Sequence, residues 1–187
     1  AEVVVFRQEV DAFGKVTLVK DPRLTLQPFG SSYRGGLNIT AGDFDGNGRE
    51  DFAVAKDSGD GAVRVYASTP ADSQPWSLLK AFTPAIAGTI AGVRLAAGDF
   101  GTFTAGATTD ASQADRKDEL VLASGPGIAP TIQILDLSAT VPAVVKTINP
   151  FTAAFRGGMS AVAARVTADG IADVIVAQGS GGTSQVQ

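Results

Sequence analysis

The sequence predicts an all-β fold of propeller-like blades, each of four antiparallel strands, in about three repeats of about 55 residues. Two observations support this prediction. Short runs rich in Val, Ile, Phe and Thr are bounded by Gly, Pro, Asp and Ser, which is typical of strands joined by tight turns. The same short motifs also return along the chain, and four strands in a period of about 40–60 residues is typical of a propeller blade.

Two motifs recur at a distance. YRGGL at 33–37 returns as FRGGM at 155–159, and a Pro-Phe pair precedes each copy at the same offset. TAGDF at 40–44 returns as AAGDF at 96–100, which is 56 residues further on. The arginine of the first motif recurs at equivalent repeat positions, so we expect it to have a structural role, such as bonding to the neighbouring blade.

A third motif sets the period. We align Asp51, Asp118 and Asp173, each at the head of an apolar run, and they are separated by 67 and 55 residues. The longer interval contains 101–114, a stretch rich in Gly, Thr, Ala and Ser that we interpret as a loop insertion. Without this insertion the period is about 55 residues, in agreement with the other motifs.

These motifs divide the chain as one repeat domain, 1–187, with incomplete blades at both ends. Its parts are a partial blade at 1–36, a first repeat at 37–92, a second at 93–158 with the insertion 101–114, and a partial third at 159–187. In the first complete repeat we expect strands at 37–41, 52–55, 62–66 and 76–82. In the partial blades we expect a third-type strand at 2–7, its hairpin partner within 15–27, and another third-type strand at 183–187.

The segment 43–51, DFDGNGRED, has the residue pattern of a calcium-binding loop. Calcium prefers six to eight oxygen ligands from carboxylates, carbonyls and water. Alternating positions of this loop offer Asp43, Asp45, Asn47, the backbone carbonyl of Arg49, and Asp51. Three carboxylates so close together repel one another unless a cation lies between them. We therefore predict Ca²⁺ as the cofactor and these five residues as its ligands.

Two other interpretations of the loop were weighed. An EF-hand needs a bidentate Glu at position twelve and flanking helices, but position twelve is Val54 and the flanks are strand-like, so we reject it. An acidic, Gly-rich hairpin turn without an ion stays open, because Asp, Asn and Gly are common turn residues.

The unit GGxxxxAGDFDGNGxxDFxVA, which begins at Gly35, resembles FG-GAP and VCBS-type repeats. These repeats build integrin-α-like β-propellers and related bacterial extracellular proteins. The resemblance extends over about 28–187 as three copies, and its first copy has the most specific loop. It implies blades of four antiparallel strands, with calcium in the loop between the first two.

The loop of the third copy departs from this pattern. Its aligned positions are Arg165, Thr167, Asp169, the carbonyl of Ile171, and Asp173. Because an arginine replaces the first carboxylate, we predict that this loop binds no metal and that its guanidinium pairs with Asp169 or Asp173.

The loop of the second copy is interrupted. Asp99 and Asp118 keep its two ends, and the insertion separates them. Asp110 and Asp115 could reach back to rebuild a site, but an insertion that has dissolved the site is the favoured alternative.

Composition narrows the function. The chain has no Cys and no His, which excludes disulfides and thiolate metal sites and removes the usual general base and Ser–His or Cys–His nucleophile systems. Its net charge of −4 does not favour nucleic acid or an anionic membrane as partner. No apolar run reaches the roughly 18 residues of a membrane-spanning helix.

We therefore expect a calcium-stabilised adhesion or scaffold module, extracellular or at the cell surface, that is not an enzyme. A carbohydrate-binding, lectin-like propeller is the alternative, and a fragment of a catalytic propeller acting on polysaccharide is a weaker one. The expected partner is an unidentified protein or glycan. Since the end blades are incomplete, a homodimer or pairing through edge strands is also open.

Overall fold

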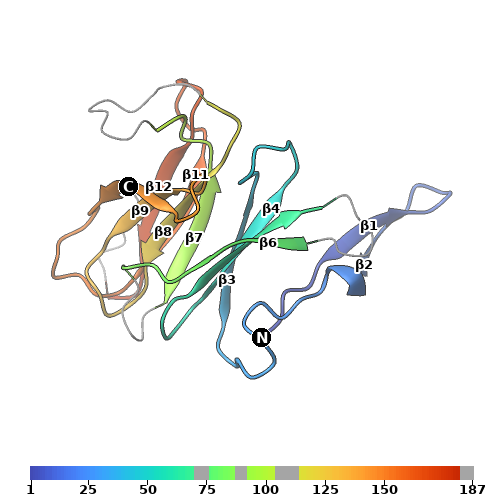
Figure 1. Ribbon diagram of the computed structural model, residues 1–187, viewed down its shortest axis with the longest axis horizontal. Helices are drawn as coiled ribbons and strands as arrows, with labels where there is room; N and C mark the ends of the chain where they lie inside the picture. The colour runs from blue at the N-terminus through green and yellow to red at the C-terminus, as the bar shows by residue number, and fades with distance from the viewer. Residues whose placement is uncertain (70–75, 87–91, 104–113, 182–187) are drawn as a thin grey trace.

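The computed structural model describes residues 1–69, 76–86, 92–103 and 114–181, and within them the chain is all-β with no α-helix (Figure 1). The strands are β1 (Phe6–Val10), β2 (Val16–Lys20), β3 (Leu37–Gly42), β4 (Asp51–Lys56), β5 (Val63–Ser68), β6 (Trp76–Phe82), β7 (Val93–Gly98), β8 (Glu119–Ser124), β9 (Ile132–Asp136), β10 (Ala143–Ile148), β11 (Met159–Ala164) and β12 (Asp173–Gln178). The described residues also contain one 3₁₀ turn, η1 (Pro22–Leu24).

The strands form four antiparallel sheets. The first full sheet has the order β3-β4-β5-β6, and the second full sheet has the order β10-β9-β8-β7. In both, each strand pairs with its neighbour in sequence, so the chain runs back and forth as a meander. The other two sheets are the N-terminal hairpin, β1-β2, and the inner pair, β11-β12. The four strands predicted for the first repeat are confirmed to within one or two residues at each end.

Equivalent positions in the sheets follow from the pairing of their first two strands. Gly42 pairs with Asp51 in the first full sheet, and Ala164 pairs with Asp173 in the inner pair. In the second full sheet Gly98 pairs with Glu119. The predicted alignment of Asp118 with the other two aspartates is therefore wrong by one residue, because strand pairing places Glu119 at the head of β8.

The full sheets stack face to face. One face of β4 and β5 packs against β7, β8 and β9 of the second full sheet and buries an apolar core between them. The buried members of this core are Phe44, Ala53, Ala55, Val63, Val65, Val93, Leu95, Leu120, Leu122, Leu135 and Leu137. The opposite face of the second full sheet buries a second core against β11 and β12, and this core includes Val121, Ile134, Met159 and Val176.

The innermost strands β3, β7 and β11 lie side by side along this stack (Figure 1). Their approach is close because small residues meet there. A Cβ added to Gly42 would lie 2.9 Å from the Cβ of Ala97, and one added to Gly98 would lie 2.9 Å from the Cβ of Ala163. The same contact therefore repeats at both sheet junctions. Within the described residues the stacked sheets do not close into a ring, so the predicted propeller stays a proposal.

The first 27 residues differ from the prediction in detail. Val3 pairs with Leu26 in an isolated antiparallel bridge and packs against Phe52 and Tyr66 of the first full sheet. The regular strand β1 begins only at Phe6 and runs past the predicted end at residue 7, because the hairpin continues outward beyond the bridge. Its partner β2 lies within 15–27 as predicted. The strand expected at 183–187 and most of the insertion lie outside the described residues.

Candidate metal loop

The loop 43–50 connects β3 to β4 at one end of the first full sheet. Its conformation is set by the Asp43 carboxylate, which accepts hydrogen bonds from the backbone N–H groups of Gly46 (2.8 Å), Asn47 (3.0 Å) and Gly48 (2.7 Å). Gly46 and Gly48 have φ values of 76° and 82°, a left-handed conformation that glycine adopts without steric cost. The chain therefore curls around the first predicted ligand.

Asp45 and Asn47 lie on the same curl. The carboxylate of Asp45 accepts hydrogen bonds from the backbone N–H of Asn47 at 3.1 Å and from its Nδ2 at 2.9 Å. The Oδ1 of Asn47 accepts the N–H of Arg49 at 2.9 Å. These hydrogen bonds orient the side chains of both residues within the loop.

The fold brings Asp51 to the other two aspartates. One carboxylate oxygen each from Asp43, Asp45 and Asp51 lie within 4.8 Å of one another. Among the described residues this is the one group of three or more acidic residues with such spacing. Oxygens at this separation can share one cation, since Ca²⁺–oxygen distances are about 2.3–2.6 Å.

Asp51 is the buried member of this triad, with 1% of its surface exposed. Its carboxylate accepts the N–H of Phe44 at 3.1 Å and that of Ser68 at 2.7 Å. Burial raises the pKa of Asp51, and repulsion from Asp45 and Asp43 adds to the rise, while the two amide hydrogen bonds oppose it. A cation in the triad would favour the ionised form of this buried carboxyl group.

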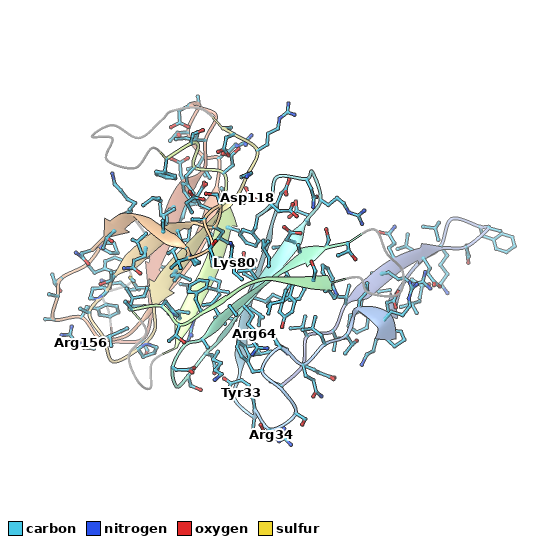
Figure 2. All side chains as sticks on the ribbon, in the orientation of Figure 1. Tyr33, Arg34, Arg64, Lys80, Asp118 and Arg156 are labelled. Carbon is cyan, nitrogen blue, oxygen red and sulfur yellow. The ribbon has the colours of Figure 1, made fainter. Side chains whose placement is uncertain are left out.

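Two more acidic residues extend the negative charge. The Oδ2 of Asp118 accepts the N–H of Asp43 at 2.9 Å, and the N–H of Asp118 donates to the carbonyl of Asp43, also at 2.9 Å. Burial, followed by repulsion from Asp118 and Asp43, raises the pKa of Glu50. Burial likewise raises the pKa of Asp118. Asp118 lies at the same end of the stack as the loop (Figure 2).

The structure thus brings together three of the five predicted ligands, Asp43, Asp45 and Asp51, and holds Asn47 on the same loop. None of the loop contacts described above tests the role of the Arg49 carbonyl, so this group stays a predicted ligand. Asp118 was predicted for the second copy, but it contacts the first loop instead.

No family model matches the chain, and no curated protein or solved structure is detectably similar to it. In the part of the chain that the structure describes, no helix has the length and apolar character needed to cross a membrane.

In the second copy the carboxylate of Asp99 is engaged by protein groups. It accepts the N–H of Gly101 (3.0 Å), Asp115 (3.2 Å) and Arg116 (3.1 Å), and it is 6% exposed. Asp115 therefore meets Asp99 through its backbone N–H. Asp110 lies outside the described residues.

The second copy also contains a buried acid that sequence reasoning missed. Glu119 is 4% exposed, and its Oε2 accepts the N–H of Phe100 at 2.9 Å, as Asp51 accepts that of Phe44. Burial raises the pKa of Glu119 to about 8, and repulsion from Asp115 and Asp99 adds to the rise. The position of Glu119 directly before the apolar run of β8 is the sequence feature that could have identified it as buried.

The third loop is held by other contacts. Arg165 forms an ion pair with Asp99 of the second full sheet at 3.6 Å, so the predicted pairing with Asp169 or Asp173 is wrong. The Asp173 carboxylate accepts the N–H groups of Thr167 and Val166, and these hydrogen bonds lower its pKa. Asp169 accepts the N–H of Ile171 at 3.2 Å. The guanidinium turns to the neighbouring sheet because a buried carboxylate is available there.

The recurring arginines lie at the opposite end of the sheets (Figure 2). Arg34 donates to the carbonyls of Ser31 and Tyr33, and Arg156 donates to those of Ala153 and Phe155. Both guanidinium groups therefore bind their own turns. The backbone carbonyl of Arg156 also accepts the N–H of Gly127, in the turn between β8 and β9, at 2.8 Å, so at this arginine the predicted contact with a neighbouring sheet is made through the backbone.

Proposed function

We propose that the loop 43–51 binds Ca²⁺, and that the ion stabilises one hairpin of a non-catalytic, extracellular adhesion or scaffold module built of FG-GAP/VCBS-type propeller blades. The main support is the convergence of Asp43, Asp45 and Asp51 within 4.8 Å at the start of a buried strand. Three ionised carboxylates at this spacing repel one another strongly unless a cation neutralises them.

The surroundings of the triad support a hard cation. Its predicted ligands are all oxygens, the type that Ca²⁺ prefers. The nearby acids Glu50 and Asp118 add negative charge, and their raised pKa values reflect in part their repulsion with Asp43. The loop is also pre-organised by backbone hydrogen bonds to Asp43, which lowers the entropic cost of binding.

The propeller part of the proposal is supported by the sheets. Two four-stranded antiparallel meanders stack face to face, with their first strands side by side. This is the arrangement expected of adjacent blades, whose inner strands line a common axis. The extracellular location and the adhesion or scaffold role rest on the resemblance of the GGxxxxAGDFDGNGxxDFxVA unit alone.

Thermal unfolding with calcium or with a chelator tests the metal proposal, on the natural chain and on Asp45→Ala. Asp45 is not buried and lies in the loop outside the strands, so its removal should leave the fold intact. We expect calcium to raise the melting temperature of the natural chain and to leave that of Asp45→Ala unchanged. Calorimetric titration with Ca²⁺ and with Mg²⁺ should give one site that prefers Ca²⁺.

Asp169→Ala is the matched control, because Asp169 is an exposed acid in the turn of the third loop. This variant should keep the full calcium response. If calcium shifts the melting temperature of neither the natural chain nor the control, the metal proposal is refuted.

A further inference from the structure

Arg94 lies on the innermost strand of the second full sheet, near the end of β7 that is far from the metal loop. It pairs with Ala123 of β8. Side chains alternate along a strand, so Arg94 shares a face of β7 with Ala96, which packs in the second core against β11 and β12. The guanidinium group of Arg94 therefore faces the junction between the second full sheet and the inner pair.

A pocket of about 130 Å³ lies at this junction, and Arg94 lines it. The other lining residues come from the turn between β8 and β9, from the start of β11 and the segment before it, and from the residue after β12. They are Pro126, Gly157, Gly158, Met159, Ser160 and Gly179. Arg156 directly precedes the two adjacent glycines and lies at the opposite end of the stack from Asp118 (Figure 2). The pocket is therefore remote from the metal loop.

Glycine backbone forms much of the pocket wall. A Cβ added to Gly158 would lie 2.8 Å from the backbone N of Pro126, and one added to Gly179 would lie 2.3 Å from the carbonyl oxygen of Gly157. The close approach of these turns leaves no room for side chains at the glycines. Among the lining residues only Arg94 carries a charge.

The guanidinium group of Arg94 has no counter-charge in the described part of the chain. Its Nη1 is buried and forms no hydrogen bond there, and Arg94 takes part in no ion pair with a described residue. The other buried side-chain polar atoms without a partner among the described residues belong to neutral groups, on Asn38, Ser68 and Gln178. A buried charge without a counter-charge is unfavourable. Water in the pocket can accept hydrogen bonds from the guanidinium, but only an anion also neutralises its charge.

The strand pairing does not require an arginine at this position. The equivalent residue in the first full sheet is Asn38, opposite Ala55, and in the inner pair it is Ser160, opposite Ala177. Both of these sheets form the same first hairpin with a small neutral residue in the place of Arg94. The charge is therefore a feature of this one junction and not of the repeated fold.

We propose that this pocket binds a small oxyanion, a phosphate, sulfate or carboxylate group, through the guanidinium of Arg94. A guanidinium presents a planar fork of N–H donors that matches two oxygens of such a group. A water molecule takes up about 30 Å³ in the liquid, so a pocket of about 130 Å³ has room for an ion of four or five heavy atoms. The bound ion would connect β7 to the turns before β11 and after β12, and so stabilise this junction.

Titration of the natural chain, freed of metal by a chelator that is then removed, tests the proposal. Sodium phosphate, sulfate and acetate are added separately, with sodium chloride at the same ionic strength as the reference. We expect a dissociation constant on the order of 1 mM for at least one of them, which is within the limit for so small a ligand. The amide NMR signals of Gly158, Ser160 and Gly179 should move with the oxyanion and not with chloride. The three series show which oxyanion the pocket prefers.

Thermal unfolding gives the second measurement. At an oxyanion concentration of about 20 mM, the melting temperature of the natural chain should rise by about 4–7 °C above its value in chloride. Arg94→Asn introduces the residue type of Asn38, so it should fold and lose most of this rise. Lys15→Asn is the matched control, because Lys15 is exposed between β1 and β2 and the change in net charge is the same. It should keep the full rise, and it also corrects for the general stabilising effect of sulfate and phosphate.

Arg94→Lys is the conservative variant. It keeps the charge but lacks the planar fork, so it should bind the oxyanion at least about fivefold more weakly than the natural chain. It also replaces Arg94→Asn in the comparison if circular dichroism shows that the asparagine variant does not fold.

The proposal is overturned if the natural chain and the folded Arg94 variant respond alike to all three oxyanions, or if the amide signals at the pocket do not move. The pocket then holds only water. A calcium response without an oxyanion response rejects this proposal alone, and the reverse result rejects the metal proposal alone, because the two sites lie at opposite ends of the stack.

Discussion

Replacing Glu119 by Gln should change how the stability of this protein depends on pH. The carboxyl group is 4% exposed and accepts one hydrogen bond, from the N–H of Phe100. Burial raises its pKa from 4.5 to about 8 in the folded chain. Between these two values the folded chain keeps the proton while the unfolded chain loses it. The free energy of unfolding therefore falls as the pH rises, by at most about 1.4 kcal/mol per pH unit.

Glutamine removes this dependence while keeping the shape of the side chain. Its amide oxygen can still accept the N–H of Phe100, and the group carries no charge at any pH. From pH 5.5 to pH 7.5 the natural chain should lose about 2 kcal/mol of unfolding free energy that Glu119→Gln does not lose. Near pH 4.5 the two proteins should have similar stability, because the carboxyl group is then protonated in the folded chain.

Urea unfolding at pH 5.5, 6.5 and 7.5, with a chelator to remove any metal contribution, measures this difference. Glu9→Gln is the control, because Glu9 is exposed and its ion pair with Arg7 contributes little. If Glu119→Gln and the natural chain lose stability in parallel over this range, the buried carboxyl group is ionised in the folded protein, and the reasoning from its burial is wrong.

Three other substitutions, and one control for the third, test further contacts in the structure. Asp51→Asn should lower the free energy of unfolding, measured in urea, by about 1–3 kcal/mol, because the new amide N–H₂ faces a buried N–H donor. It should also abolish the rise in melting temperature with calcium. If that rise persists, Asp51 is not a ligand. Arg165→Ala should lower the free energy of unfolding by less than about 1 kcal/mol, since the arginine is largely exposed although its partner Asp99 is buried. A larger loss would show that the ion pair is stronger than its distance of 3.6 Å indicates. Gly92→Ala should cost several kcal/mol, at least about 3, because its Cβ would lie 2.2 Å from the backbone of the preceding sheet. Gly14 has a similar positive φ but open space around it, so Gly14→Ala should lower the free energy of unfolding by only about 1 kcal/mol. Equal losses in the two glycine variants would mean that backbone conformation, and not the close contact at Gly92, sets the loss of stability.

The strands and the conformation of the loop 43–51 could be predicted because their signals are local. Apolar runs of four to seven residues between Gly- and Asp-rich turns gave β3 to β6 to within one or two residues. The curl of the loop follows from Asp43 and from glycines that accept a positive φ, and both are visible in the sequence. Burial of the third carboxylate also follows, since Asp51 directly precedes the apolar run of β4.

The contacts that could not be predicted depend on neighbouring sheets. Two adjacent acids open β8, and only the pairing with Gly98 decides that Glu119 turns inward while Asp118 turns to the first loop. Arg165 finds its partner Asp99 across a sheet junction that no sequence spacing encodes. The sequence also did not determine where the strands of the N-terminal hairpin begin and end, because strand-forming residues continue on both sides of the Val3–Leu26 bridge.

The backbone link between Asp118 and Asp43 joins the metal loop to the next sheet, and it has a counterpart one sheet further on. There the N–H of Ala172 donates to the carbonyl of Asp99 at 2.8 Å. Each loop therefore couples its own sheet to its neighbour, as in repeat proteins whose stability is a sum of unit and nearest-neighbour contributions. An ion that orders the first loop would strengthen one junction and not the other, so unfolding would begin at the inner pair and reach the metal-bearing sheet last.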